Sequence, residues 1–409
     1  PIRRIFADGI FQVGNQYSKT WSFTDINYAI ASKEDKTSMF LDYSELLNAL
    51  DSGASAKITI YNRRINKAEF ERSVLLPDKD DGLDEYRHEF NQMLTAQVTG
   101  TSNSIVRERY LTVSVVKRNP DEARSYFARV GTDLVTHLAQ LSSVANELTL
   151  TERLHIFRDF FKAGEQAAAE FNIHEHAKRG QHFKDLFCPD SMEFAADHFK
   201  LDARYGRVLY LQDYASYIKD SFVSELCDLD RDLMLSIDIL PVPTDEAARQ
   251  LQSTLLGVET NVANWQRRQN ANNNFTATIP YDMELQRKET KEMLDDLTTR
   301  DQRMMFGLVT LVHLADSKEQ LDSDTETLYS TARKHLCQLS TLRWQQKDGL
   351  DTVLPYGLRK IQALRTLTTE STAVLIPFRA QEIMQPNGLY YGQNAVSKNM
   401  IVADRRLLL

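Results

Sequence analysis

Short alternations of apolar and polar residues and longer runs with helical spacing follow one another along the first part of the chain. The alternation predicts strands at residues 10–13, 20–30, 56–61 and 110–116, with an irregularity in the second at Asp25. The helical spacing predicts helices at residues 32–50, 84–97 and 120–141. Asn119 and Pro120 are the N-cap and first residue expected of the last helix. This order of strands and helices is typical of an α+β unit.

The second half repeats this order after a predicted helix at 149–171 and a polar, histidine-rich connector at 172–189. Strands are predicted at residues 192–199, 207–211, 233–239, 304–314 and 339–344, and helices at 216–228 and 316–335. Residues 244–299 contain two helical patterns separated by the polar run NANNNFT, which predicts a projecting helical hairpin. Such projections often contact partner proteins.

We therefore predict an α+β protein with two lobes of mixed or antiparallel sheet covered on one side by helices. The lobes comprise residues 1–171 and 190–380, and the repeated element order suggests a duplication. Residues 381–409 form a separate tail, in which 400–409 has the composition of a strand. The tail ends on three leucines, and we expect it to be the first strand of a domain that follows.

Composition narrows the possible functions. The net charge of −8 and the scattered basic doublets disfavour a surface that binds duplex nucleic acid by electrostatics. Three widely spaced cysteines fit a reducing compartment better than a disulfide framework. The longest apolar run, residues 304–315, is too short to span a bilayer.

Histidines gather between His155 and His198, which raises the alternative of a metal site. The local set is His174, Glu175, His176, His182 and Cys188. Two histidines separated by one residue lie on different faces of a helix, unlike the HExxH spacing that binds zinc. A solvated connector is the favoured interpretation.

Motifs for nucleotide binding and nucleophilic catalysis are absent from the sequence. There is no GxxxxGK[ST] motif, and Gly388 and Gly392 are not followed by the Lys-Ser/Thr pair that reaches phosphate and Mg²⁺. There is also no GxSxG motif. We expect no cofactor and no catalytic residue in this chain.

The segment after Trp344 carries a more specific signal. It reads QQKDGLDTVLPYGLRKI, then RTLTTESTAVLIPFRAQEI, then LYYGQNAVSKNMIVADRR. These runs resemble the segment ahead of the nucleotide-binding loop in the conjugation ATPases of type IV secretion systems. The group is the TraC/TrbE/CagE-like family, in the branch typical of Gram-positive conjugative elements. Residues 23–40, Tyr281-Asp282 and the stretch from Arg300 to Met304 also resemble that family.

The resemblance implies that the chain is the amino-terminal region of such an ATPase, cut just before its Walker A motif. The complete protein would bind ATP and Mg²⁺ and hydrolyse ATP to drive DNA transfer or channel assembly. This region would dock the motor to membrane-embedded and scaffold subunits and support its oligomerisation. The expected location is cytoplasmic, peripheral at the inner face of the cell membrane.

The resemblance also supplies candidates for the linker to the motor, and they are Tyr390, Tyr391, Gly392, Asn394, Asp404 and Arg405. A different class of function stays open beside it. Arg267 and Arg268 beside Trp265 could bind single-stranded DNA and guide it to the motor, although a solvated hairpin tip is favoured.

Overall fold

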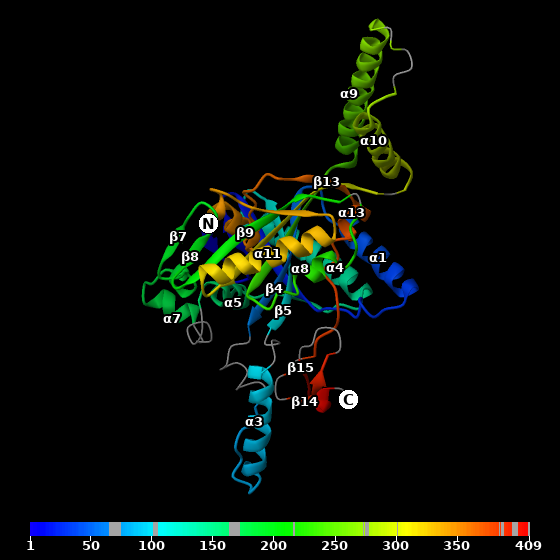
Figure 1. The fold of residues 1–409 in the computed structure, drawn as a ribbon. Coiled ribbons are helices and arrows are strands. Elements are labelled where there is room, and N and C mark those ends of the chain that lie inside the picture. Colours follow the sequence, from blue (N-terminus) through cyan, green and yellow to red (C-terminus); the bar gives the residue numbers. More distant parts are fainter. Residues whose placement is uncertain are drawn as a thin grey trace.

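The architecture is taken from a computed structural model, which describes residues 1–64, 75–100, 105–162, 172–215, 217–272, 274, 278–300, 302–383, 385, 388–394 and 400–407. The described residues place thirteen strands in one sheet, all paired antiparallel (Figure 1). The main strand order is β1-β2-β3-β5-β4-β10-β11-β9-β8-β7, while β6, β12 and β13 pair beside β3, β9 and β11. The α+β class expected from the alternation of patterns is confirmed.

The strands of this sheet are β1 (Arg4–Ile5), β2 (Phe11–Val13), β3 (Gln16–Phe23), β4 (Ala54–Arg64), β5 (Ile105–Val116), β6 (Ala145–Glu147), β7 (Met192–Phe194), β8 (Phe199–Leu201), β9 (Arg204–Asp213), β10 (Leu233–Pro241), β11 (Met304–Ala315), β12 (Gln338–Thr341) and β13 (Arg365–Thr368). A separate hairpin consists of β14 (Leu389–Gln393) and β15 (Met400–Ala403). The helices are α1 (Lys33–Asn48), α3 (Asp84–Gly100), α4 (Pro120–Gln140), α5 (Leu150–Phe161), α7 (Ile173–Lys178), α8 (Phe222–Leu226), α9 (Thr244–Ala271), α10 (Tyr281–Thr299), α11 (Lys318–Lys334), α12 (Gln346–Val353) and α13 (Thr369–Ala373), with short 3-10 helices η1 (Phe183–Leu186) and η2 (Arg405–Leu407).

The two expected lobes share this sheet, because β4 of the first half pairs with β10 of the second. At the centre of the seam, the hydroxyls of Thr59 and Ser236 lie 3.0 Å apart. Nearby, the buried Lys57 ammonium donates to the Asp238 carboxylate at 3.0 Å. Apolar side chains surround these polar groups, so the seam is part of the core and the halves are not separate bodies.

The halves repeat one another in topology. In each half, a strand hairpin is followed by a helix, a strand, a helical insertion, a strand and a helix. A short strand then returns to pair beside the third strand of that half. β2–β3 in the first half thus corresponds to β8–β9 in the second, and β6 to β12. The same sequence spacing relates Phe11 to Phe199, Tyr17 to Tyr205 and Lys19 to Arg207. The repeated element order read from the sequence therefore has a structural counterpart.

Helices cover both faces of the sheet, whereas the sequence patterns suggested one covered face. On one face, α1, α4, α8 and α11 bury side chains such as Leu46, Phe127 and Leu328. On the other face, α5 and α12 bury Phe157 and Val353. This explains why β10 has no exposed face: Leu235 and Ile237 join the first cluster and Met234 the second.

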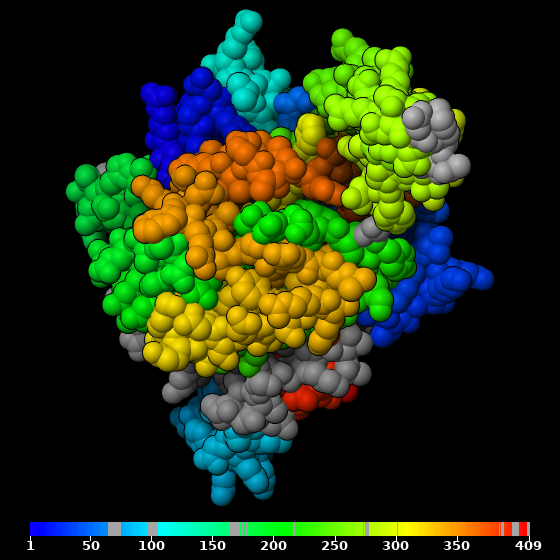
Figure 2. Space-filling model, turned by 45° about the horizontal axis from the view of Figure 1, so that its top comes forward, coloured from blue at the N-terminus to red at the C-terminus, as the bar shows by residue number. Residues whose placement is uncertain are grey.

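The two helical insertions project from opposite ends of the sheet (Figure 1). The first follows β4 and contains α3, and the second follows β10 and is the α9–α10 hairpin. Because β4 and β10 are antiparallel neighbours, the chain leaves these strands in opposite directions. In Figure 2 the α9–α10 hairpin lies at the top right of the molecule and α3 at the bottom. The projecting hairpin expected from residues 244–299 is confirmed.

Several predicted boundaries were wrong. The strand expected at 20–30 ends at Phe23, because Asp25 turns inward to bind other segments. The strand expected at 192–199 is a hairpin, β7–β8, since Ala195 and His198 close a turn between them. The helix expected at 216–228 is only α8.

Three more boundaries changed. The connector at 172–189 contains α7 and η1, and the helix expected at 149–171 ends at Phe161 within the described residues. The strand expected at 339–344 stops at Thr341, because Trp344 has a left-handed backbone with φ of 62°. Among the helices that the structure describes, none has the length and apolar character needed to cross a membrane.

Candidate functional site

The segment that leads to the predicted motor linker crosses back from the second half to the first. After β13 pairs with β11, α13 turns the chain toward the core beside α1. Phe378 then packs its ring edge-on against Phe23 and Tyr43, with ring centroids 5.7 and 6.0 Å apart. Burial of this aromatic group fixes the crossing segment to the first half.

A buried ion pair holds the same segment through its backbone. The Arg109 guanidinium of β5 pairs with the Asp25 carboxylate, and its Nε donates to the Pro377 carbonyl at 2.8 Å. The Asp25 oxygens accept the amide hydrogens of Arg379 at 2.7 Å and Ala380 at 3.1 Å. Burial lowers the pKa of Arg109, and the neighbouring Asp25 carboxylate opposes that shift. We call residues Asp25, Arg109 and 377–380 the crossing clamp.

Two further contacts extend the crossing clamp along the chain. The Ala29 amide donates to the Arg379 carbonyl at 2.8 Å, and the Gln381 amide donates to Asn27 Oδ1 at 2.9 Å. The Arg379 guanidinium also pairs with Asp228, which follows α8. Residues 25–29 are therefore shaped by their contacts with residues 377–381, and not by pairing within a strand.

Beyond the crossing clamp, all six predicted linker residues lie in or beside the β14–β15 hairpin. Tyr390 is opposite Val402, and a β-bulge follows in the ladder between Tyr390 and Gly392. Gly392 has φ of 143°, a conformation that favours glycine. Asn394 donates to the Gln381 carbonyl at 3.0 Å, which closes the hairpin onto the end of the crossing segment.

The charged residues after β15 bind separate partners. Asp404 pairs with Arg406 at 2.9 Å, and these hydrogen bonds lower the pKa of the Asp404 carboxyl. Arg405 instead lies over the Tyr391 ring, with its guanidinium 5.4 Å from the centroid and a hydrogen bond to the phenol. The strand expected at 400–409 ends at Ala403 and continues as η2, while Leu408 and Leu409 lie outside the described residues.

The β14–β15 hairpin packs on α3, the insertion of the first half. Leu94 of α3 and Val402 of β15 are fully buried against each other, with Phe90 and Tyr390 beside them. Asn91 braces the loop ahead of α3 by exchanging two hydrogen bonds of 2.9 Å with the Leu76 backbone. The apolar stripe of this helix was visible in the sequence, but nothing in the pattern indicated the C-terminal hairpin as its partner.

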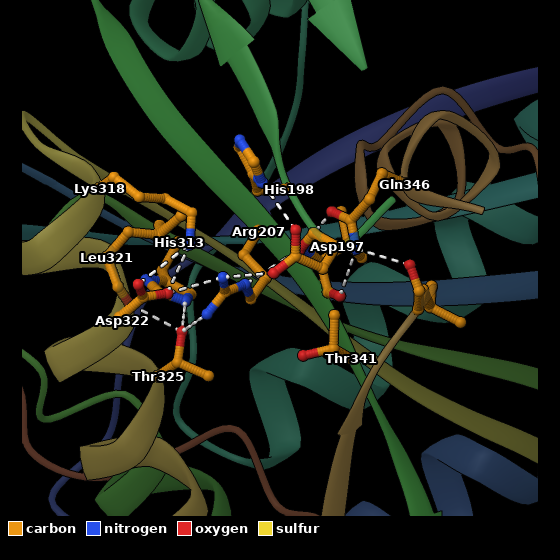
Figure 3. A network of polar contacts seen from close by, with 12 residues as sticks. Asp197, His198, Arg207, His313, Lys318, Leu321, Asp322, Thr325, Thr341 and Gln346 are labelled. Carbon is orange, nitrogen blue, oxygen red and sulfur yellow. Dashed lines mark hydrogen bonds and ion pairs between the residues drawn. The ribbon is translucent and has the colours of Figure 1, made fainter. Parts of the chain in front are cut away.

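A second polar network lies where α11 crosses β9 (Figure 3). Arg207 donates to Asp197 Oδ2 at 3.0 Å, to Asp322 Oδ1 at 2.8 Å and to Thr325 Oγ1 at 2.9 Å. Asp197 also binds His198, and Asp322 also binds Lys318. Both carboxylates already have cationic partners, so this network fastens α11 to the sheet and offers no unbalanced charge to a ligand.

The buried His313 ring belongs to the same network. Its Nε2 lies 3.1 Å from Thr325 Oγ1, and its Nδ1 has no hydrogen-bond partner among the described residues. Burial, with a smaller contribution from Arg207, lowers the pKa of His313 to about 3. The imidazole is therefore neutral near pH 7.

The histidines considered for a metal site are spread over several elements. His155 lies in α5, His174 and His176 in α7, and His182 caps η1 ahead of Cys188. Within the described part of the chain, no group of three or more His, Cys, Asp or Glu side chains is placed to hold a metal ion. Cys188, Cys227 and Cys337 are all unpaired thiols.

Comparison with protein-family models and with curated proteins finds no match to this chain.

Proposed function

We propose that this chain is a non-catalytic docking and assembly module of a type IV secretion ATPase. The observation that carries the proposal is the crossing clamp, which fixes the C-terminal segment to the core before that segment forms the β14–β15 hairpin on α3. A motor domain joined to such a hairpin would be anchored to a large rigid sheet. Anchoring is what allows the work of ATP hydrolysis to be delivered to a channel.

The α9–α10 hairpin supplies the docking arm in this proposal. Its base is packed into the body through Leu251, Leu297 and Met304. Its middle is held by ion pairs of Glu259 with Arg287 at 2.8 Å and Lys291 at 3.2 Å. The arm thus keeps its shape while standing away from the sheet, at the end opposite the linker. Its partners would be the membrane-embedded and scaffold subunits at the inner face of the membrane.

Shortening the arm tests its docking role. Replacing residues 256–290 by a short Gly/Asn turn removes the distal arm and keeps the packed base. We expect the shortened protein to fold, with an unchanged midpoint of thermal unfolding, but to lose co-purification with the inner-membrane channel subunits of its own transfer system. A variant with Arg249→Ala, which removes only exposed contacts of α9 with Asp245, serves as the control. Undiminished co-purification of the shortened protein would rule out the arm as the docking element.

Absence of nucleotide binding is a second expectation of the proposal. Isothermal titration of the 409-residue chain with Mg²⁺-ATP should give no binding heat, because the sequence lacks a glycine-rich phosphate loop. Measurable, saturable affinity would mean that the chain carries chemistry of its own.

The alternative of a single-strand DNA guide rests on the distal arm. Arg267 and Arg268 are exposed there beside the half-buried Trp265. If the arm guides DNA, a fluorescent oligonucleotide should bind in a salt-dependent way and lose affinity on Arg267→Glu with Arg268→Glu. The docking proposal expects no such binding, so the same titration separates the two functions.

A further inference from the structure

One short strand at the border of the sheet has an open outer edge. β12 pairs with β9, and among the described residues no strand lies on its other side. An open groove of about 1280 Å³ runs along this edge, between the strand and the α11 side chains Glu326, Tyr329 and Arg333. In Figure 2, α11 and the residues after it form the near face, in yellow to orange.

The β7–β8 hairpin closes one end of this groove. β8 and β12 follow one another along β9, with β8 opposite residues 204–206 and β12 opposite the later residues of that strand. β7 pairs with the outer side of β8, so it occupies the next strand position outward, which continues along β12. The turn of the hairpin meets the chain after β12, where the Trp344 amide donates to the Ala196 carbonyl at 2.6 Å. The strand position beside β12 is thus closed after Thr341 and open toward Leu336.

The hydrogen-bond pattern shows which backbone groups of β12 point outward. The Leu342 amide donates to the Val208 carbonyl at 3.1 Å, so Ser340, two residues earlier, also faces β9. The amide and carbonyl groups of Leu339 and Thr341 therefore point away from β9 toward the groove. Such an edge can pair with an added strand.

A strand added there would place alternate side chains against α11. Thr341 Oγ1 lies 2.7 Å from the Tyr329 hydroxyl, and Leu339 belongs to the core beneath α11, so both side chains point to that face. Ser340 points to the opposite face, where its hydroxyl donates to Gln212 Oε1 at 2.5 Å. Residues directly opposite on neighbouring strands point to the same face. The groove therefore suits an apolar–polar–apolar segment, with its polar residue opposite Ser340.

An exposed leucine in the lining of the groove supports an apolar occupant. Leu336 is 82% exposed and has φ of 57°, a left-handed backbone conformation that disfavours residues with a Cβ. It occupies the αL position of a Schellman motif, where glycine is usual, because the Cys337 amide donates to the Ala332 carbonyl. The fold thus holds a large apolar group in water at the open end of the groove.

The charges of the groove disfavour a strongly charged occupant. The Asp197 and Asp322 carboxylates in its lining are both paired with Arg207. The other charged side chains of the lining make no ion pair within the described residues and balance one another: Arg333, Arg343, Asp213 and Glu326. A balanced groove suits a neutral peptide backbone better than a polyanion such as nucleic acid.

We propose that β12 binds a short extended segment of another protein as an added antiparallel strand. The backbone of the segment pairs with Leu339 and Thr341, and its two residues opposite them are apolar and pack toward Tyr329 and Leu336. β7 already runs antiparallel to β8 in the same strand position, so the added strand continues a row that the fold itself begins. The closed end limits the segment to a few residues. This inference does not depend on the proposed role in secretion.

Selection from a random heptapeptide library displayed on phage tests the proposal, with the 409-residue chain as bait. We expect the enriched peptides to alternate apolar and polar residues and to lack proline at their centre, because pairing needs a backbone amide there. Fluorescein-labelled copies of these peptides then serve as probes in anisotropy titrations. A selection that yields no binder, or binders without alternation, would overturn the proposal.

Two substitutions at Thr341 isolate the backbone contact. Thr341→Pro removes the outward amide and leaves the pairing of Ser340 with β9, whereas Thr341→Val keeps the amide and removes the same hydroxyl. The dissociation constant of a selected peptide should be roughly tenfold higher or more for the Pro variant than for the Val variant, because a peptide carbonyl loses its donor. Equal affinities would show that the peptide does not pair with β12.

Hydrogen exchange gives the same test without a substitution. A selected peptide should slow the exchange of the Leu339 and Thr341 amides in the original chain, because each amide gains an acceptor or is covered by the added strand. Unchanged exchange of both amides at saturating peptide would contradict strand addition even if the Thr341→Pro variant fails to fold.

The apolar contact has its own pair of variants. Leu336→Gly suits the left-handed backbone and should leave thermal stability equal or higher. It should nonetheless weaken binding of a selected peptide roughly fivefold or more, as truncated interface anchors do. Leu256→Ala, at a leucine that is 70% exposed on the projecting α9, should leave the affinity unchanged. Equal losses in the two variants would place the peptide on exposed apolar surface in general and not in the groove.

Discussion

At the scale of single residues, buried polar side chains join segments that are far apart in the chain. Arg109 and Asp25 hold residues 377–380, and Arg153 reaches the carbonyls of Gly9 and Ser18 at 2.8 Å. Each buried cation satisfies several acceptors, as buried charge requires. None of these roles was visible in the sequence, because an isolated Arg on a strand or helix shows nothing of its distant partner.

His313 gives a pH-dependent prediction at this scale. Its folded pKa of about 3 lies below the ordinary histidine value, so between these values the unfolded chain binds more protons than the folded chain. The contribution of His313 to stability is complete above about pH 6.5 and is lost as the pH falls toward 3. His313→Phe should reduce the loss of stability between pH 7 and 5 in urea denaturation. His88→Phe, at an exposed histidine, should leave the loss as large as in the original chain.

At the scale of elements, the amphipathic helices and their N-caps could be predicted from the sequence. The contacts between distant elements, such as those of the crossing segment, could not. Asn119 caps α4 as predicted, and the Ser32 and Ser317 side chains cap α1 and α11 in the same way. These signals are local, so one chain segment carries them completely. The pairing of β14–β15 with α3 depends instead on where the crossing clamp delivers the chain, and periodicity does not encode that. The six linker residues could be predicted to lie near one another only because they are close together in the sequence.

The contact between α3 and the C-terminal hairpin gives a prediction for these elements. Leu94→Ala removes the buried apolar group that faces Val402 and should release the hairpin from α3. Hydrogen exchange of residues 389–393 and 400–403 should then rise, while the urea midpoint of the main sheet stays nearly constant. Met93→Ala, at the adjacent and 42% exposed position, should change neither. Unaltered exchange in Leu94→Ala would show that α3 does not hold the hairpin.

At the scale of the whole molecule, the sequence indicated two repeated halves, and the structure joins them in one sheet. The repeat was readable because element order survives in the hydrophobic pattern. The join was not, because β4 and β10 have the composition of any central strand and more than a hundred residues separate them. Their pairing has a mechanical consequence: a load on the α9–α10 arm reaches the α3 end through continuous hydrogen-bonded strands, with no hinge between lobes.

The continuous sheet predicts that damage in one half is felt in both. Phe127→Ala in α4 removes a fully buried ring and should cost about 3–5 kcal/mol of unfolding free energy. If the halves unfold together, the backbone amides of β11 in the second half should lose their protection from hydrogen exchange at the same lowered urea concentration as those of β5. Leu328→Ala, in the corresponding helix α11 of the second half, should in turn reduce the hydrogen-exchange protection of β5 in the first half. Were the halves independent, each substitution would shift only its own half, and the seam between β4 and β10 would then be too weak to carry load from the arm to the linker.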